Sequence, residues 1–426
     1  MTLEIPSMRD HQHPYYYARN VSIYFDYDRQ TPWTKATDLI NYSMTCRSIR
    51  AMCMPPLFAS IVWSASQDPD PVVTKGLSPY VRAVRILYPS HFKRDAYLAF
   101  LAQFPNVREL HVDRLGTTPF EAHSLDWAFV SCPIEVMVLT ISGASTLYLP
   151  PGLALPPLRE FTVIAPRRMA LLSQLSVHLL RMENSALEYV LGSLRDSLEV
   201  LRVPGDAMRL SFLGAAHWPR LTRFALFGGH PFADASWSDV LSVMPVLQSF
   251  ILDTAYIQPA PPVYLWPPPD VDVEGVTRRS LNIANLRGLV LSSPRPRDRV
   301  FALLPPTLIE LALRDTPRYD RERTAPRGSA YDLIVRLQPD PPVYDRYLLS
   351  SRGALDIFTV LRGDALLRLE LVVRADAFEM RMLVQVAETC PRLRIFEYHR
   401  YRDVPDTWEW DRRNLQPGDG VQIVSH

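Results

Sequence analysis

The chain has 426 residues, with 46 basic and 45 acidic side chains and a formal net charge of +1. This balance offers no basic surface of the kind that a general nucleic-acid binder needs, so we expect no nucleic-acid partner. No run approaches the ~18 apolar residues that a membrane span requires, and the start lacks the basic-then-apolar pattern of a secretory signal. We therefore expect a protein of the cytosol or the nucleus that does not contact membranes.

The N-terminal region divides into two parts. Residues 1–35 are aromatic and polar without a sustained period, so no domain is assigned to them. Residues 36–63 begin with Leu39, Met44 and Ile49 at helix-like spacing, and Pro55-Pro56 ends that pattern. This segment is predicted to be a short helical module.

The helical module carries a family resemblance. Cys46-Arg47-Ser48 followed by Arg50, and then Pro56-Leu57-Phe58, resembles the second half of the F-box found in fungal repeat proteins. The match covers about 28 residues, and Leu3 to Pro6 is the only counterpart of the motif's opening. The resemblance implies docking on the Skp-type adaptor of a cullin-based ubiquitin ligase. The implied apolar contacts are Leu39, Met44, Ile49, Pro56, Leu57 and Phe58. The alternative is a helix that only caps the open end of a repeat array.

From residue 77 to residue 400 one phrase returns about eleven times. Its plainest copy runs from Pro105 to Val112 and places apolar residues in the pattern apolar-x-x-apolar-x-apolar. The copies begin at Val81, Val107, Val136, Leu158, Leu198, Leu221, Leu247, Leu286, Leu308, Leu366 and Leu393. Most intervals lie in the twenties, so the chain resembles the leucine-rich-repeat class. The predicted fold is an α/β solenoid with parallel strands on one face and helices on the other.

Two details support the repeat prediction. Ser236 followed by Asp239 is a capping-box-like helix start within one unit. The residue before the proline that opens a unit is Phe104, Trp218, Met244 or Cys390, and Cys132 holds the same slot. A slot shared by these residue types is a buried apolar position, so its cysteines are expected to pack rather than to bind metal.

Insertions at residues 254–284 and 314–347 interrupt the regular spacing of the repeats. Each contains Pro-Pro-Val-Tyr, and this string in an extended proline-rich segment is the kind of ligand that WW domains bind. The candidate residues are Pro261, Pro262, Tyr264, Pro341, Pro342 and Tyr344. The alternative is that both tyrosines pack on the surface of the solenoid. Residues 401–426 are predicted to be a C-terminal cap.

The strand face is the predicted binding surface. Alternation along each strand sends the intervening residues of the phrase to the concave side. One such column contains Thr140 in the early part and becomes apolar in the middle, where we expect an exposed patch. The candidate target contacts are Arg202, Arg223, Ala225, Ile251, Val290 and Ala312. The alternative is that the insertion after Ile251 folds over the patch.

No constellation of side chains favours catalysis. The sequence shows no phosphate-binding glycine loop, no nucleophile-elbow spacing and no paired cysteine or histidine ligand set. We therefore expect no enzyme activity, no cofactor and no metal. The sequence favours a substrate receptor that joins a Skp-type adaptor and a protein target. The second hypothesis is a free-standing repeat scaffold that engages WW-domain proteins.

Overall fold

A computed structural model describes most of the repeat region and the helix before it. The described residues are 46–64, 78–87, 94–115, 122–124, 133–141, 146–148, 155–164, 177–255, 264–267, 283–315, 348–401 and 422–424. Within these ranges, none of the helices is both long and apolar enough to cross a membrane.

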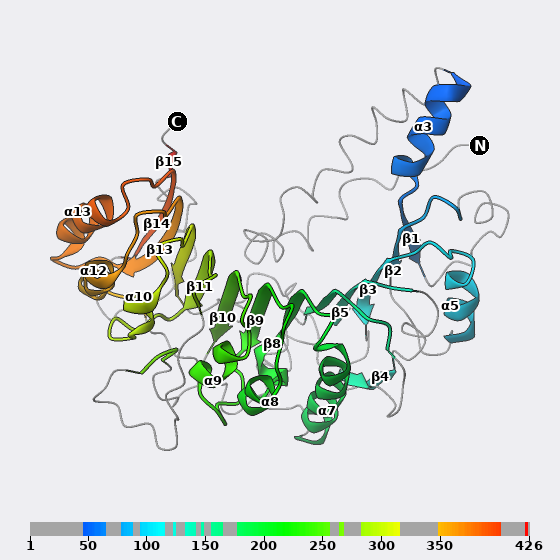
Figure 1. Ribbon diagram of the computed structural model, residues 1–426, viewed down its shortest axis with the longest axis horizontal. Coiled ribbons are helices and arrows are strands. Elements are labelled where there is room, and N and C mark those ends of the chain that lie inside the picture. The colour runs from blue at the N-terminus through cyan, green and yellow to red at the C-terminus, as the bar shows by residue number, and fades with distance from the viewer. Residues whose placement is uncertain are drawn as a thin grey trace, which may run out of the picture.

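All the described strands except β4 (Ala122–Ser124) and β6 (Thr146–Tyr148) form one long curved sheet, with the helices on its outer side (Figure 1). The sheet has thirteen strands in chain order, all parallel except the last, which pairs antiparallel with its neighbour. The strands are β1 (Ser60–Ser64), β2 (Ala83–Leu87), β3 (Glu109–Leu115), β5 (Val136–Ile141), β7 (Glu160–Ile164), β8 (Val200–Pro204), β9 (Arg223–Gly229), β10 (Ser249–Ala255), β11 (Gly288–Ser292), β12 (Glu310–Arg314), β13 (Arg368–Arg374), β14 (Ile395–Tyr401) and β15 (Gln422–Val424). The result is the solenoid-like α/β repeat that the sequence predicts.

Helices connect many of the strands along the outer side. They are α5 (Arg94–Leu101), α7 (Val177–Leu194), the short 3-10 turn η5 (Gly205–Ala207), α8 (Leu210–Ala215), α9 (Trp237–Ser242), α10 (Val300–Leu303), α12 (Ser351–Val360) and α13 (Glu379–Thr389). A further helix, α3 (Arg47–Leu57), precedes β1 at one end of the array, and β4 pairs with β6 in a separate two-stranded ladder. The predicted cap of α9 is confirmed, because the Ser236 hydroxyl accepts a hydrogen bond from the Asp239 N–H at 3.1 Å.

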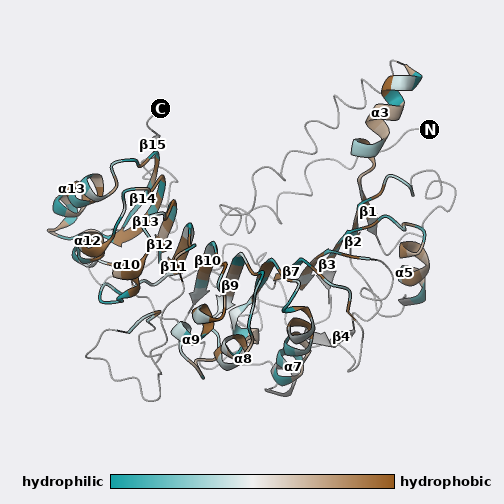
Figure 2. Cartoon of the chain, in the orientation of Figure 1, coloured by the Kyte–Doolittle hydropathy of each residue, from teal (hydrophilic) through white to brown (hydrophobic). Residues whose placement is uncertain are grey.

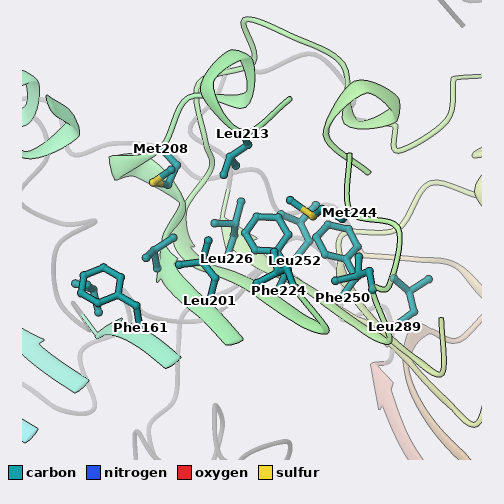
Figure 3. Close-up of a cluster of buried hydrophobic side chains, with 14 of the residues drawn as sticks. Phe161, Leu201, Met208, Leu213, Phe224, Leu226, Met244, Phe250, Leu252 and Leu289 are labelled. Atoms are coloured by element: carbon teal, nitrogen blue, oxygen red, sulfur yellow. The ribbon is translucent and has the colours of Figure 1, made fainter. Parts of the chain in front are cut away.

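The core lies between the sheet and the helices. The apolar positions of the phrase stack in columns, so that Leu201, Phe224, Phe250 and Leu289 are register partners on four successive strands (Figure 3). The rings of Phe224 and Phe250 stack at a centroid separation of 5.7 Å. Outer helices such as α7 and α13 carry hydrophobic and hydrophilic surfaces on different sides (Figure 2), as expected for helices that cover a core. Cys390 is buried as predicted, and burial raises the pKa of its thiol to about 11.

Each strand begins with the same backbone arrangement, which we call a rung. The carbonyl oxygen of the residue directly before one strand accepts two hydrogen bonds from the next unit. The carbonyl of Gln248, for example, accepts from the N–H groups of Arg287 (2.7 Å) and Gly288 (3.0 Å). Equivalent pairs of bonds join every successive pair of parallel strands from β1 to β14. The rungs hold the register even across β12 and β13, which the insertion at 314–347 separates in the chain.

Two expectations about the repeats change in the structure. The copy predicted to begin at Val136 is shifted by two residues, because Leu110 pairs with Met137 and Val112 pairs with Leu139. A shift of two keeps side chains on the same face, so apolar periodicity alone does not reveal it. The concave column therefore contains Val138 where the pattern predicted Thr140. The sheet also begins before residue 77, with β1, whose Ile61 and Trp63 pair with β2.

Two glycines provide a matched test of this packing. A Cβ on Gly205 would lie against the carbonyl oxygen of Gly229, closer than two atoms can approach, and 3.2 Å from Pro231 Cδ. On Gly192, in α7, a Cβ would meet nothing within 4 Å. Gly205→Ala should therefore destabilise the fold by about 1–3 kcal/mol, whereas Gly192→Ala should stabilise it by about 0.5 kcal/mol or more. Urea unfolding midpoints of both variants check the signs, and two shifts of the same sign would contradict this packing.

Candidate functional site

A shallow pocket of about 270 Å³ opens on the concave face in the middle of the sheet. Its walls come from the first half of β8 to β12 and from the residues directly before those strands. Arg202, Arg223, Ala225 and Ile251, all predicted from the sequence, lie along it. The structure thus brings four of the six predicted target contacts together.

Several pocket residues were missed by the sequence reasoning. Gln248 and Arg287 lie outside the concave columns of the repeat pattern, whereas Ser249, Gly288 and Glu310 lie in one of these columns but were not among the expected target contacts. Gln248 and Arg287 belong to the rim column, which we define as the residues directly before each strand whose carbonyls form the rungs. The repeat phrase marks this slot in every copy, so the slot itself was visible in the sequence. Gln248 and Arg287 were not expected because the concave columns contain only residues inside the strands.

The apolar part of the concave face differs from the prediction. Ala225, Val290 and Ala312 are buried, with Val290 only 1% exposed, and Ile251 is half-buried. Val290 and Ala312 also lie outside the pocket. The expected exposed patch across these four residues is therefore wrong.

A buried ion cluster lies on the same face, where Glu370 is the register partner of Ala312. The Arg314 guanidinium, from β12, donates two hydrogen bonds to Glu370 on β13 (2.9 and 2.8 Å) and one to Asp253 on β10 (3.3 Å). Because β11 lies between β10 and β12, the Arg314 side chain crosses the strand that carries Val290. Burial raises the pKa of the Asp253 carboxyl to about 6; the Arg314 charge opposes this rise and the Glu370 charge adds to it.

The charges of the rim column differ before and within the pocket. In the earlier units Arg108, Glu135, Arg159 and Glu199 alternate in charge, with nitrogen–oxygen distances of 3.7, 3.8 and 2.7 Å along the row. Hydrogen bonding to Arg159 lowers the pKa of Glu199. Beyond Glu199 the column has no acidic residue, so the Arg287 guanidinium has no carboxylate beside it in this row.

The pocket therefore holds guanidinium groups without internal partners. Among the interactions of the described residues, the side chains of Arg223 and Arg287 make neither an ion pair nor a hydrogen bond, and both residues are exposed. Arg202, deeper in the pocket, lies 3.7 Å from Glu160. Glu310 is the acidic residue of the lining. This arrangement can attract an anionic group from another molecule.

The predicted adaptor contacts are described in part. Leu39 and Met44 lie outside the described residues. Ile49 (36% exposed) and Pro56 are exposed on α3, whereas Leu57 and Phe58 are half-buried where the helix meets β1. Met52, which was not among the predicted contacts, is 76% exposed on the same helix. Its place in the helical period was the signal that could have identified it.

Tyr264 is the described member of the two Pro-Pro-Val-Tyr strings, and it is half-buried. The next residue, Leu265, is buried and its N–H donates to the Asp298 carboxylate at 2.6 Å. Pro261, Pro262, Pro341, Pro342 and Tyr344 lie outside the described residues. Binding to WW domains stays a prediction.

One group of possible metal ligands occurs among the described residues. Ligand atoms of Glu370, Glu397 and His399 lie within 4.8 Å of one another on β13 and β14. Both carboxylates already accept hydrogen bonds from arginines, Glu370 from Arg314 and Glu397 from Arg368 at 2.6 Å. Because these guanidinium groups neutralise the acidic charge, we assign no metal site here.

The Asp253 carboxyl yields a pH-dependent prediction. Its pKa in the folded chain, about 6, is higher than its ordinary value of 3.8, so its protonated form stabilises the fold at low pH and this contribution is lost as the pH rises through 6. Between pH 4 and 7 the stability of Asp253→Asn relative to wild type should therefore rise, by at most about 2–3 kcal/mol. Urea titrations at several pH values measure this difference. Asp196→Asn, at a side chain that is 79% exposed, is the control, and a difference for Asp253→Asn that does not vary with pH would refute the assignment.

Comparison with known proteins finds no matching family model and no matching curated protein. Among solved structures, the chain is similar to a chain in the crystal structure of the Rad7 and Elc1 complex in yeast. The alignment covers 93% of this chain and 94% of that one, at 12% sequence identity and a TM-score of 0.34. A likeness of this strength assigns neither a family nor a function to the chain.

Proposed function

We propose that the chain is a non-catalytic substrate receptor of a Skp–cullin–F-box type ubiquitin ligase. In this role α3 docks on the adaptor and the concave face of the repeats selects the protein target. The observation that carries the proposal is the exposed apolar surface of α3, at the opposite end of the described helices from α13 (Figure 1).

The exposure on α3 is unusual for a helix that only caps a core. Met52 is 76% exposed and Ile49 is 36% exposed, and Val62 on the adjoining strand β1 is 50% exposed. Several exposed large apolar side chains within one short segment favour a binding partner. These residues lie in the segment that resembles the second half of an F-box, so a Skp-type adaptor is the partner that fits best.

Within this surface the proposed contacts take two roles. Ile49, Met52 and Pro56 offer exposed apolar area to the adaptor. Leu57 and Phe58 are half-buried at the junction with β1, so they fix the direction of the helix relative to the sheet. The Phe58 N–H donates to the Met54 carbonyl at 3.1 Å and closes the last turn of the helix.

The concave pocket serves target recognition in this proposal. It lies in the middle of the sheet, several strands away from α3 and β1. Adaptor and target would therefore occupy separate surfaces of one chain. A chain that binds a target without any adaptor would instead be a free-standing interaction scaffold, and the two functions differ in the first experiment below.

Met52→Asp should remove adaptor binding, because it places a charge in the centre of the proposed apolar contact. We expect at least a tenfold loss of the Skp-type adaptor that co-purifies with the chain. Met380→Asp is the matched control, since Met380 is 72% exposed on α13 at the other end of the array and should retain full binding. No capture by either protein would favour the scaffold, and equal capture by wild type and Met52→Asp would exclude α3 as the docking surface.

Ile251 and Val290 should respond differently to a charge. Ile251 lines the pocket and is half-buried, so Ile251→Asp should reduce target capture at least tenfold with little change in the unfolding midpoint. Val290 is 1% exposed, and Val290→Asp should destabilise the chain by several kcal/mol because it buries an unpaired charge. Proximity labelling and quantitative mass spectrometry measure capture, and thermal unfolding measures stability. Undiminished capture by a folded Ile251→Asp variant would exclude the pocket from recognition.

A further inference from the structure

We infer that the concave pocket takes an extended, acidic peptide segment of the target, with two carboxylate side chains placed two residues apart. One carboxylate pairs with Arg223 and the other with Arg287. This inference rests on the proposed function, in which the concave face selects the target, and it names the chemistry of the segment that is selected.

The charges of the pocket point to an acidic partner. Arg223 and Arg287 are exposed, and neither guanidinium has an ion pair or a hydrogen bond among the described interactions. Other arginines of the strand face are paired internally, as Arg85 is with Asp113 and Arg368 is with Glu397. A guanidinium presents a planar fork of donors that matches a carboxylate. The two unpaired forks are thus complementary to carboxylates from outside the chain.

The spacing of the two arginines sets the spacing of the ligand. Arg223 begins β9, Arg287 stands directly before β11, and β10 lies between these strands. Because neighbouring strands lie about 4.8 Å apart, the two arginines start roughly 10 Å apart across the sheet. In an extended peptide, residues i and i+2 point to the same side and lie roughly 6.6 Å apart. Flexible arginine and glutamate side chains cover the remaining distance.

The floor of the pocket leaves room for this segment. Gly288 interrupts a row of larger side chains between Ser249 and Glu310 on the neighbouring strands. A Cβ on Gly288 would meet the Ser249 Oγ at 3.6 Å and the Glu310 Oε2 at 3.9 Å, which are ordinary contacts. The missing side chain therefore leaves a notch in the surface. Ile251, beside the notch, offers apolar contact to the residue between the two acids.

The test uses the full chain and a fluorescein-labelled octapeptide, Gly-Ser-Glu-Ala-Glu-Ser-Gly-Ser. Fluorescence anisotropy should show saturable binding that weakens as salt is added, because the paired groups are exposed. The matched peptide with glutamine in place of both glutamates should bind at least tenfold more weakly. Equal binding of the two peptides, or no binding of either, would overturn the inference.

Variants of the chain locate the binding site. Arg223→Gln and Arg287→Gln should each weaken the acidic peptide about five- to tenfold, since each loses a charge-assisted pair. Glu310→Gln should strengthen binding about two- to fivefold, because it removes the acidic residue of the lining. Arg394→Gln is the matched control: Arg394 is exposed, stands directly before β14 as Arg287 stands before β11, and lies outside the pocket. A loss for Arg394→Gln as large as that for Arg287→Gln would reduce the effect to general charge attraction and overturn the inference.

Gly288→Leu tests the pocket without a change of charge. Its Cβ fits, so the fold should keep its unfolding midpoint within about 2 °C, and the longer side chain should fill the notch and weaken the acidic peptide at least tenfold. Unchanged peptide affinity in this variant would exclude the notch. Adaptor capture and peptide binding, both measured on the wild-type chain, separate the two proposals. Adaptor binding without peptide binding overturns the acidic ligand and leaves the receptor function standing, whereas peptide binding without adaptor binding does the reverse.

Discussion

The backbone rung is the constraint on which the rest of this structure depends. One carbonyl before each strand accepts two N–H groups from the next unit, and the same bonds recur from β1 to β14. Backbone hydrogen bonds of this kind do not depend on side-chain identity, so units with long insertions remain in register with regular ones. The rung therefore converts an irregular sequence into a regular surface. It aligns the rim column and the concave columns and so places Arg223 and Arg287 around one notch.

The concave face of the sheet carries two kinds of charged group, one buried and one exposed. Near the middle of β10 to β13, Asp253, Arg314 and Glu370 form a buried cluster that spans the strands. Desolvation of these charges offsets much of their mutual attraction, so the net contribution of the cluster to stability is small. At the starts of β9 and β11, Arg223 and Arg287 are exposed and make no ion pair or hydrogen bond among the described interactions. The buried cluster thus ties the strands together, while the open arginines remain available to another molecule.

The sequence predicted the parallel repeat, the concave face and four pocket residues, because apolar periodicity reports which side of a strand faces the core. It placed the copy at Val136 two residues away from its true register, since a shift of two preserves that periodicity. It predicted exposure for Val290 and Ala312, because the column says which way a side chain points but not what crosses above it. On the same face Arg314 contacts Asp253, which lies two strands away, and such long-range contacts leave no local pattern. Arg287 was missed because it lies just outside the strand.

Amide hydrogen exchange, resolved to single residues, is the most direct test of the rung. The account predicts strong and similar protection at Gln248, Arg287 and Arg394, whose N–H groups all donate to rung carbonyls, although insertions of different length separate their units. The side chains at these positions are exposed, but the backbone N–H groups are hydrogen-bonded, so their exchange should still be slow. Exchange at the rate of an unfolded chain at any of the three positions would contradict the continuous ladder and the binding surface derived from it.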